Sequence, residues 1–365
     1  MKKSWKALLG AAGGFASAGA VAYLFLRARS TGEIEPYLDD EGNPLAGSVA
    51  EITKVEIGGR QQGMILKGRS DKNPVLLFLH GGPGTPEYLL MKHFPLNLED
   101  YFTVCWWDQR GSGLSYAPDI GSGELTVERM VEDTIEVTNY LRERFGKEKI
   151  YLMGHSWGTF LGIHAAQLHP ALYEAYIGIG QVVCHGESQK LTYAHMTETA
   201  RAQGDLKTAQ KLEALQEKDS SSTALQDILL VNATLFKQGG GMFHDSKKIP
   251  LAFLRAVMTK EYTLADKINF FKGAALTISQ PAWDTVMSSD LSETIPALEI
   301  PVHIIHGVYD MQTSYDMAKA YFERLIAPEK HFHVFENSAH SPPMEEPERF
   351  MRIIKKDLLK LKSNV

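Results

Sequence analysis

The chain has 365 residues, of which 44% are hydrophobic and 22% are charged, an ordinary composition for a globular protein with a large core. Its net charge of −6 gives no overall basic footprint of the kind that nucleic-acid binding proteins show. Its two cysteines, Cys105 and Cys184, allow one disulfide at most, a pairing that the sequence leaves open. No Cys/His cluster has the spacing of a zinc site.

Residues 1–30 are predicted to be a membrane anchor or a signal segment. Three lysines precede an uncharged stretch, 7–26, which Arg27 and Arg29 close. A helix that spans a bilayer needs about 20 apolar residues, and this stretch is just long enough. Small residues between 16 and 20 offer a cleavage site, which would give a secreted protein. The apolar run 21–26 continues past them and favours a single-pass anchor.

The charges at the two ends of this segment bear on its orientation. Three lysines and the terminal amine stand before it, against two arginines after it. This difference favours a cytoplasmic N-terminus and an exported remainder of the chain. Membrane association through the N-terminal segment is therefore expected.

Residues 31–48 lack periodicity and contain Gly, Pro, Asp and Glu, so they are predicted to be a linker. Beyond them strands and helices alternate. Strands are predicted at 51–57, 62–67, 75–79, 102–107, 150–153, 175–180, 302–306 and 331–335, and helices at 127–145, 159–169, 314–326 and 347–361. The central strands are short apolar runs, typical of strands covered on both faces. The alternation predicts a mostly parallel α/β sheet with helices on both faces, in two core parts, 49–181 and 299–365.

Two loops follow early strands of this sheet. The first is His80-Gly81-Gly82-Pro83-Gly84, in which the glycines let the backbone turn its N–H groups inward. The second is Asp108-Gln109-Arg110-Gly111-Ser112-Gly113. We interpret Asp108 and Arg110 as structural residues that pair to fix loops near a site.

The segment Gly154-His155-Ser156-Trp157-Gly158 lies between a predicted strand and a predicted helix. This is the context of a nucleophile elbow, a sharp turn that exposes the serine hydroxyl. A chance glycine-rich turn is the alternative. We predict Ser156 as nucleophile. An oxyanion needs preorganised N–H donors, and we predict Gly82 and Trp157, with Gly81 as a substitute for Gly82.

From 182 to 298 the pattern is helical, with helices predicted at 190–202, 206–217, 223–236 and 251–258 and no clear strand. Because this region separates two predicted core strands, it is expected to form a helical cap over the ends of the sheet.

A serine nucleophile needs a base, which an acid orients, and in this kind of fold both follow the serine in the chain. Asp310 stands just past the strand 302–306, and His340 stands in the loop after the last strand. We predict Asp310 as acid and His340 as base. Asp310 could instead cap a helix near Thr313. Asp316 and Glu336 are alternative acids, and His331 and His333 are alternative bases.

With these motifs in place, the chain resembles the prolyl iminopeptidase family of α/β-hydrolases. The matching segments are His80–Gly84, Asp108–Gly113, Gly154–Gly158, His306-Gly307 with Asp310, and Ala339-His340. The resemblance spans about 50–181 and 299–362 and implies the α/β-hydrolase fold with the triad Ser156, Asp310 and His340. Family members that remove N-terminal proline bind the substrate amine with cap glutamates beside a tryptophan. The cap of this chain has no Trp-Glu pair; Trp283 is followed by Asp284.

The resemblance implies an aminopeptidase-like serine hydrolase that forms an acyl-enzyme and releases an N-terminal residue from a short peptide. A carboxylester or small-amide hydrolase is the alternative, because the cap diverges. A non-catalytic binding protein is a second alternative. No cofactor or metal is expected.

Overall fold

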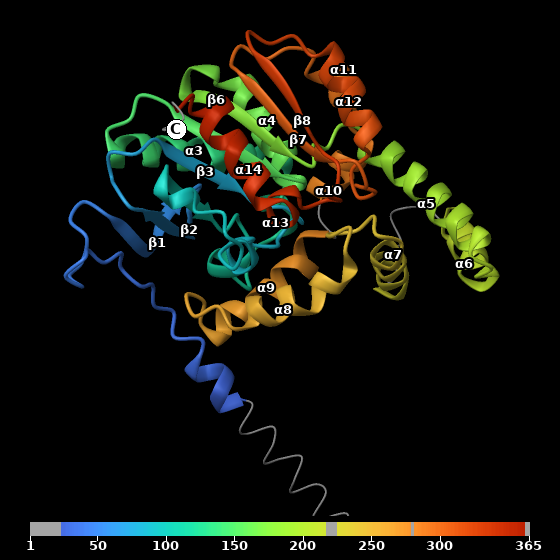
Figure 1. Ribbon diagram of the computed structural model, residues 1–365, viewed down its shortest axis with the longest axis horizontal. Helices are drawn as coiled ribbons and strands as arrows, with labels where there is room; N and C mark the ends of the chain where they lie inside the picture. The colour runs from blue at the N-terminus through green and yellow to red at the C-terminus, as the bar shows by residue number, and fades with distance from the viewer. Residues whose placement is uncertain (1–22, 217–224, 279–280, 362–365) are drawn as a thin grey trace, which may run out of the picture.

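The computed structural model describes residues 23–216, 225–278 and 281–361, and its centre is one eight-stranded sheet (Figure 1). The strands run in the order β1-β2-β4-β3-β5-β6-β7-β8. Only the pairs β1–β2 and β2–β4 are antiparallel; the other five pairs are parallel. The strands are β1 Val49–Ile57, β2 Arg60–Gly68, β3 Val75–Leu79, β4 Thr103–Trp107, β5 Ile150–His155, β6 Tyr173–Ile179, β7 Val302–Gly307 and β8 Lys330–Phe335. The predicted sheet is confirmed.

Helices cover both faces of the sheet, and the residues of β3 show why. Its five side chains are all buried, and successive side chains point to opposite faces. Val75, Leu77 and Leu79 pack in one core with α3 (Val127–Phe145), α4 (Trp157–Leu168) and α12 (Tyr315–Arg324). Leu76 and Phe78 pack in another core with α2 (Tyr88–Met91), α13 (Pro342–Glu345) and α14 (Pro347–Ile353). A short apolar run therefore serves two layers at once.

Between β6 and β7 the described part of the chain forms helices and no strand of the sheet. They are α5 His185–Ala202, α6 Leu206–Gln216, α7 Leu225–Gln238, α8 Ile249–Val257, α9 Leu264–Ile278, α10 Pro281–Ser288 and α11 Leu291–Thr294. In Figure 1 α8 and α9 lie below the sheet, α5 and α6 project from the body at the right, and α11 lies beside α12 at the top. The described helices between β6 and β7 all fall within the predicted cap, whose boundaries stay a prediction.

Residues 23–28 are helical. Among the residues that the structure describes, no helix has the length and apolar character needed to cross a bilayer. Most of the predicted anchor, residues 1–22, lies outside that part of the chain.

Candidate active site

Ser156 stands between the end of β5 and the start of α4, and its backbone is strained. Its φ of 52° and ψ of −120° place it in a region that a residue with a side chain rarely adopts. Its N–H donates to the carbonyl of Ile179 on the neighbouring strand at 2.9 Å, and its own carbonyl accepts from Thr159 N–H at 2.8 Å. These bonds hold the turn that the elbow motif predicts.

The two glycines of the motif are required by close backbone packing. A Cβ atom on Gly154 would collide with the carbonyl of Gly158, and one on Gly158 would collide with the carbonyl of Leu79 at the end of β3. The helix can therefore start directly over the sheet only when both positions lack a side chain.

Asp310 and His340 come together although 30 positions separate them. The Nδ1–H of His340 donates to Asp310 Oδ2 at 2.7 Å, and both side chains are buried. Oδ1 of Asp310 also accepts from the N–H groups of Gln312 and Thr313 at 2.8 and 3.0 Å. Asp310 therefore holds the turn that precedes α12 as well as pairing with His340, but it does not cap the helix, because the N-cap of α12 is Ser314.

Electrostatics at this pair suit a base and its partner. Burial would raise the pKa of the Asp310 carboxyl, but His340 and His306 hold that pKa well below its usual value. Burial lowers the pKa of His340, an effect that Asp310 only partly opposes. At neutral pH the pair is therefore a carboxylate beside a neutral imidazole, with Nε2 free to accept a proton.

Ser156, Gly82 and Trp157 line one pocket of about 140 Å³. Trp157 is the first residue of α4, so its N–H is among those that a helix leaves unpaired at its N-terminus. Gly82 has a φ of 115°, and a Cβ there would lie 2.8 Å from the N atom of Gly84. The structure brings both predicted oxyanion donors to the wall of the serine's pocket.

Gln109 links these two donor segments. Its side-chain amide donates to the carbonyl of His80 at 2.9 Å and accepts from the indole N–H of Trp157 at 2.9 Å. Its backbone N–H donates to Nε2 of His80 at 3.1 Å, and burial lowers the pKa of that imidazole to about 4, which keeps Nε2 an acceptor. Gln109 therefore fixes the position of the loop that carries Gly82 relative to the elbow that carries Trp157.

The predicted pairing of Asp108 with Arg110 is wrong. Arg110 instead forms a bidentate ion pair with buried Asp133 at 2.7 and 2.9 Å. Asp108 accepts from Leu114 N–H and from the hydroxyl of Tyr262 on the cap side, both at 2.8 Å. Both residues are structural, but Arg110 points toward α3 and Asp108 toward the cap.

Two residues that the sequence analysis did not single out as functional connect the loops of the site. The Nδ1 of His155 pairs with Glu87, and its Nε2–H donates to the backbone carbonyl of His340 at 2.7 Å. A carboxylate and a carbonyl only accept, so both ring nitrogens donate and His155 is an imidazolium. Burial opposes this charge, but Glu87, the carbonyl of His340 and Asp310 together outweigh burial and raise the pKa of His155.

This chain of bonds joins three segments: the loop after β3, the elbow, and the loop 336–341 that carries His340, which we call the base loop. The rings of His155 and His340 have centroids 4.7 Å apart, so the charge on His155 also lowers the pKa of His340. The only sequence signal was the position of His155 inside the elbow motif, because Glu87 lies in a loop with no recognisable spacing to it.

Comparison with known proteins agrees with this geometry. A family model described as alpha/beta hydrolase fold matches residues 74–347. The chain belongs to the α/β-hydrolase family. It is 35% identical over 309 residues to the probable aminopeptidase YbaC of Bacillus subtilis (strain 168), covering 84% of this chain and 96% of that protein.

Two further relatives fit the resemblance seen in the sequence. The hydrolase is 25% identical to the proline iminopeptidase of Clostridium botulinum, over 80% of this chain and 91% of that one. The solved structure of proline iminopeptidase from Mycobacterium smegmatis shares the fold, with a TM-score of 0.60 at 19% identity and coverage of 85% and 98%. The predicted relationship to the prolyl iminopeptidases is confirmed.

The cap of the hydrolase supplies most of the wall opposite Ser156. His185 and Trp283 line the pocket, with ring centroids 5.0 Å apart. Nδ1 of His185 is buried without a hydrogen-bond partner, and burial lowers the pKa of this imidazole to about 4. A neutral ring with an unused polar atom at this place is available to a substrate.

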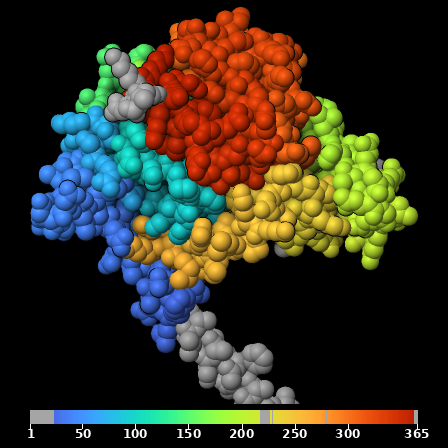
Figure 2. All heavy atoms as spheres, in the orientation of Figure 1, coloured from blue at the N-terminus to red at the C-terminus, as the bar shows by residue number. Residues whose placement is uncertain are grey.

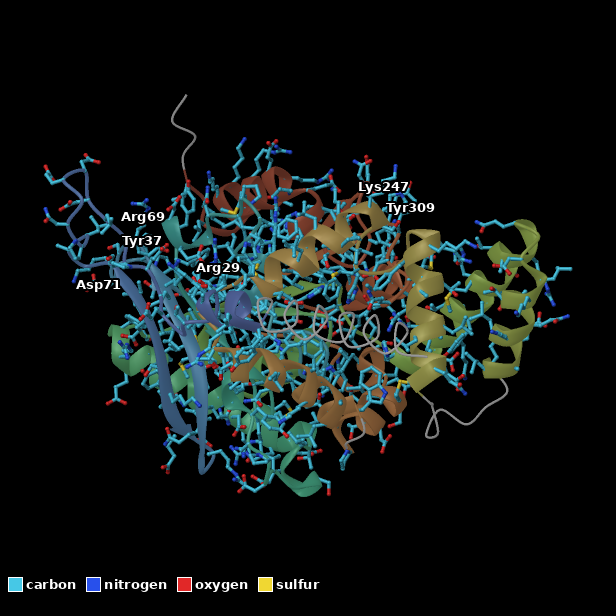
Figure 3. All side chains as sticks on the ribbon, turned by 90° about the horizontal axis from the view of Figure 1, so that it is seen from below. Arg29, Tyr37, Arg69, Asp71, Lys247 and Tyr309 are labelled. Carbon is cyan, nitrogen blue, oxygen red and sulfur yellow. The ribbon has the colours of Figure 1, made fainter. Side chains whose placement is uncertain are left out.

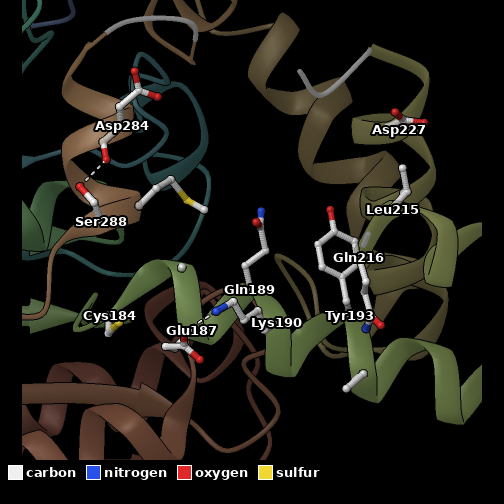
Figure 4. A pocket seen from close by; sticks show the side chains of 13 residues that line it. Cys184, Glu187, Gln189, Lys190, Tyr193, Leu215, Gln216, Asp227, Asp284 and Ser288 are labelled. Atoms are coloured by element: carbon white, nitrogen blue, oxygen red, sulfur yellow. Dashed lines mark hydrogen bonds and ion pairs between the residues drawn. The ribbon is translucent and has the colours of Figure 1, made fainter. Parts of the chain in front are cut away.

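A larger hollow of about 940 Å³ adjoins this pocket, and Gln189 lines both. Its wall includes the carboxylates of Glu187, Asp227 and Asp284. Figure 4 shows Gln189 projecting from α5 into the hollow, with Asp284 and Asp227 on opposite sides. Glu187 is paired with Lys190 at 2.6 Å.

No group of three His, Cys, Asp or Glu side chains in the described ranges is arranged to hold a metal ion. Cys105 and Cys184 are both free thiols, the first buried and the second half-buried. The possible disulfide is therefore not formed.

Proposed function

We propose that this hydrolase is an aminopeptidase-like enzyme that releases an N-terminal residue, such as proline, from short peptides through an acyl-enzyme. Ser156 Oγ attacks the first carbonyl of the peptide while His340 Nε2 takes its proton. The N–H groups of Gly82 and Trp157 stabilise the oxyanion. His340 then protonates the leaving amine. Water next attacks the acyl carbonyl while His340 takes its proton, the bond to Ser156 Oγ breaks, and His340 returns the proton to Ser156.

The acid-lined hollow beside the serine's pocket is the observation that supports a substrate with a free amine. An aminopeptidase must recognise a charged α-amino group, and carboxylates at the cap do this by ion pairing. Asp284 follows Trp283, so the two residues line adjoining cavities. We assign the amine contact to Asp284, one methylene shorter than the glutamate expected from the resemblance.

Steady-state hydrolysis of proline 2-naphthylamide, its N-acetylated analogue and p-nitrophenyl acetate tests this proposal. We expect turnover of the free-amine substrate, weak turnover of the acetylated one, and none by Ser156→Ala. Asp284→Asn should raise KM for the free-amine substrate about tenfold and leave ester hydrolysis unchanged. Turnover of the ester alone would establish the carboxylester hydrolase that the missing Trp-Glu pair favours.

For the N-terminus we propose a single-pass anchor in residues 1–30, with the hydrolase domain exported. The supporting observation is the uncharged stretch 7–26 between lysines and arginines. Alkaline extraction of membranes tests it. Full-length protein that stays in the pellet supports an anchor, and release into the supernatant contradicts it.

A further inference from the structure

An unusual share of the exposed apolar surface is concentrated on one side of the molecule. In the described ranges, 17 large hydrophobic side chains are exposed, and nine of them belong to α8, α9 and residues 23–25. Their exposed fractions run from 39% for Val257 to 64% for Phe271. We call these nine residues the apolar face; they are Tyr23, Leu24, Phe25, Leu251, Phe253, Leu254, Val257, Ile268 and Phe271. The surface of a soluble protein rarely groups so many exposed apolar side chains unless a partner or a membrane covers them.

The helices present these side chains by their periodicity. On α9, positions 264, 268, 271 and 275 follow the i, i+4, i+7, i+11 spacing of a single stripe, and the residues there are Leu, Ile, Phe and Ala. The opposite side of α9 lies against the active-site loops, since a Cβ on Gly273 would lie 2.6 Å from the carbonyl of Gly111. The stripe therefore points outward, one helix diameter of about 10 Å from those loops.

The three segments form one surface rather than three separate patches. Leu26, Phe253, Val257, Ile268 and Phe271 all line a single apolar hollow of about 220 Å³. Buried Lys267 of α9 fixes the N-terminal segment there. Its Nζ donates to Ser30 Oγ at 2.7 Å and to the carbonyl of Arg29 at 3.3 Å. Figure 2 shows the blue N-terminal residues against the gold and orange cap.

The charges around the apolar face are mostly positive, although Asp266 on α9 is half-buried and Glu33 and Glu35 are exposed nearby. Residues 246–278 contain six lysines and arginines and two acids, in a chain whose net charge is −6. Lys247, Lys248, Arg255 and Lys272 are exposed, as are Arg27 and Arg29 on the N-terminal segment, whereas Glu261 is buried. Figure 3 looks onto this side from below, with Arg29 near the middle of the view and Lys247 to one side.

We propose that the apolar face is a docking surface for a lipid bilayer that contains anionic lipids. Exposed aromatic and aliphatic side chains enter the acyl boundary, while the surrounding cations meet the headgroups. The neighbouring sequence supports this occupant, because the uncharged stretch 7–26 includes Tyr23, Leu24 and Phe25 of the apolar face. The hydrolase then sits with the outer side of α9 on the membrane.

The test must report on the face itself, because an N-terminal anchor alone would hold the full chain on vesicles. The full-length protein carries Cys184→Ser, which removes the accessible thiol, and Phe271→Cys labelled with the fluorophore NBD. Leu168→Cys is the matched control, since Leu168 at the end of α4 is 60% exposed against 64% for Phe271. Both proteins are reconstituted into phosphatidylcholine vesicles, with or without phosphatidylglycerol, that contain spin-labelled lipid.

We expect at least a twofold quenching of the probe at 271 when phosphatidylglycerol is present, less without it or in high salt, and none at 168. Leu254→Glu should abolish the quenching at 271, whereas Leu206→Glu, at a site of equal exposure on α6, should not. Equal quenching at 271 and 168, or none at 271, overturns the proposal.

The same variants also test whether the apolar face binds a second copy of this chain instead of a bilayer. Light scattering of the detergent-purified chain reports its oligomeric state. If it is a dimer that Leu254→Glu dissociates, the face is an interface between copies and the bilayer proposal is wrong. A monomer with quenching at 271 supports the bilayer.

Discussion

At the scale of single residues, the site depends on which groups hold charge. Two neighbours act in opposite directions on the pKa of His340: Asp310 raises it and the imidazolium of His155 lowers it. In the proposed mechanism His340 is therefore neutral and oriented before substrate arrives, which is the preorganisation that acyl transfer needs.

The first prediction concerns Asp310. Asp310→Asn should lower kcat about 1,000-fold or more, because the amide cannot hold the imidazole in the tautomer with Nδ1 protonated. Asp316→Asn is the control, since Asp316 is exposed on α12 and was one of the two alternative acids. Steady-state kinetics with the best amide substrate measure both. Comparable losses for the two variants would contradict the assignment of Asp310.

The second prediction follows from the lowered pKa of His340. A base must be unprotonated to act, so activity falls as the pH drops through its folded-state pKa. Because burial moves that pKa below its usual 6.5, the acid limb of kcat/KM should have its midpoint below pH 6.5. The pH profile measures this, with intrinsic fluorescence at each pH to show that the protein stays folded. A midpoint above 6.5 would disprove the electrostatic argument.

The third prediction concerns Glu87, which positions the base loop through His155. Glu87→Ala should lower kcat about tenfold with little change in KM, because loss of a charged hydrogen bond is worth about 1.5 kcal/mol or more. Glu87→Gln keeps an acceptor for His155 and should recover most of the activity. Equal losses in kcat for Ala and Gln, or a change confined to KM, would argue against a positioning role.

At the scale of elements, the absence of a Cβ atom at Gly158 allows α4 to begin directly over the sheet. The fourth prediction is that Gly158→Ala destabilises the fold by about 3 kcal/mol, since the new Cβ meets the rigid carbonyl of Leu79. Gly123→Ala is the matched control, because a Cβ there meets nothing within 4 Å. Urea denaturation compares the two; similar midpoints would show that the elbow backbone can shift.

The sequence could predict the elements whose pattern is local. The strands of the sheet were recognisable because central strands such as β3 are short uninterrupted apolar runs, and Ser156 because the glycines around it have a steric cause. The helix α9 was missed although its apolar stripe has helical spacing, because Gly273 in its interior is a residue that disfavours a helix. The bond from His155 to the His340 carbonyl spans 185 positions, and no spacing encodes it.

At the scale of the whole molecule, a cluster of histidines at the sheet edge links stability to pH. Nδ1 of His303 on β7 lies 3.1 Å from Nε2 of His333 on β8, and their rings stack with centroids 5.5 Å apart. Burial, with repulsion from His333, lowers the pKa of His303 to about 3. Burial, which Asp357 only partly opposes, lowers the pKa of His333 to about 4. The folded protein therefore resists protonating either ring.

The fifth prediction follows from the sign of these shifts. Below pH 6.5, His303 and His333 bind protons in the unfolded chain but stay neutral in the folded protein. The free energy of unfolding therefore falls as the pH drops from about 6.5 to 4. Each histidine contributes a slope of up to about 1.4 kcal/mol per pH unit. His333→Phe, which keeps the stacked ring, should remove about half of this combined contribution. Urea denaturation at several pH values measures the slope, and pH 8 supplies the reference at which both rings are neutral in either state. An unchanged slope in the variant would show that acid destabilisation arises elsewhere in the molecule.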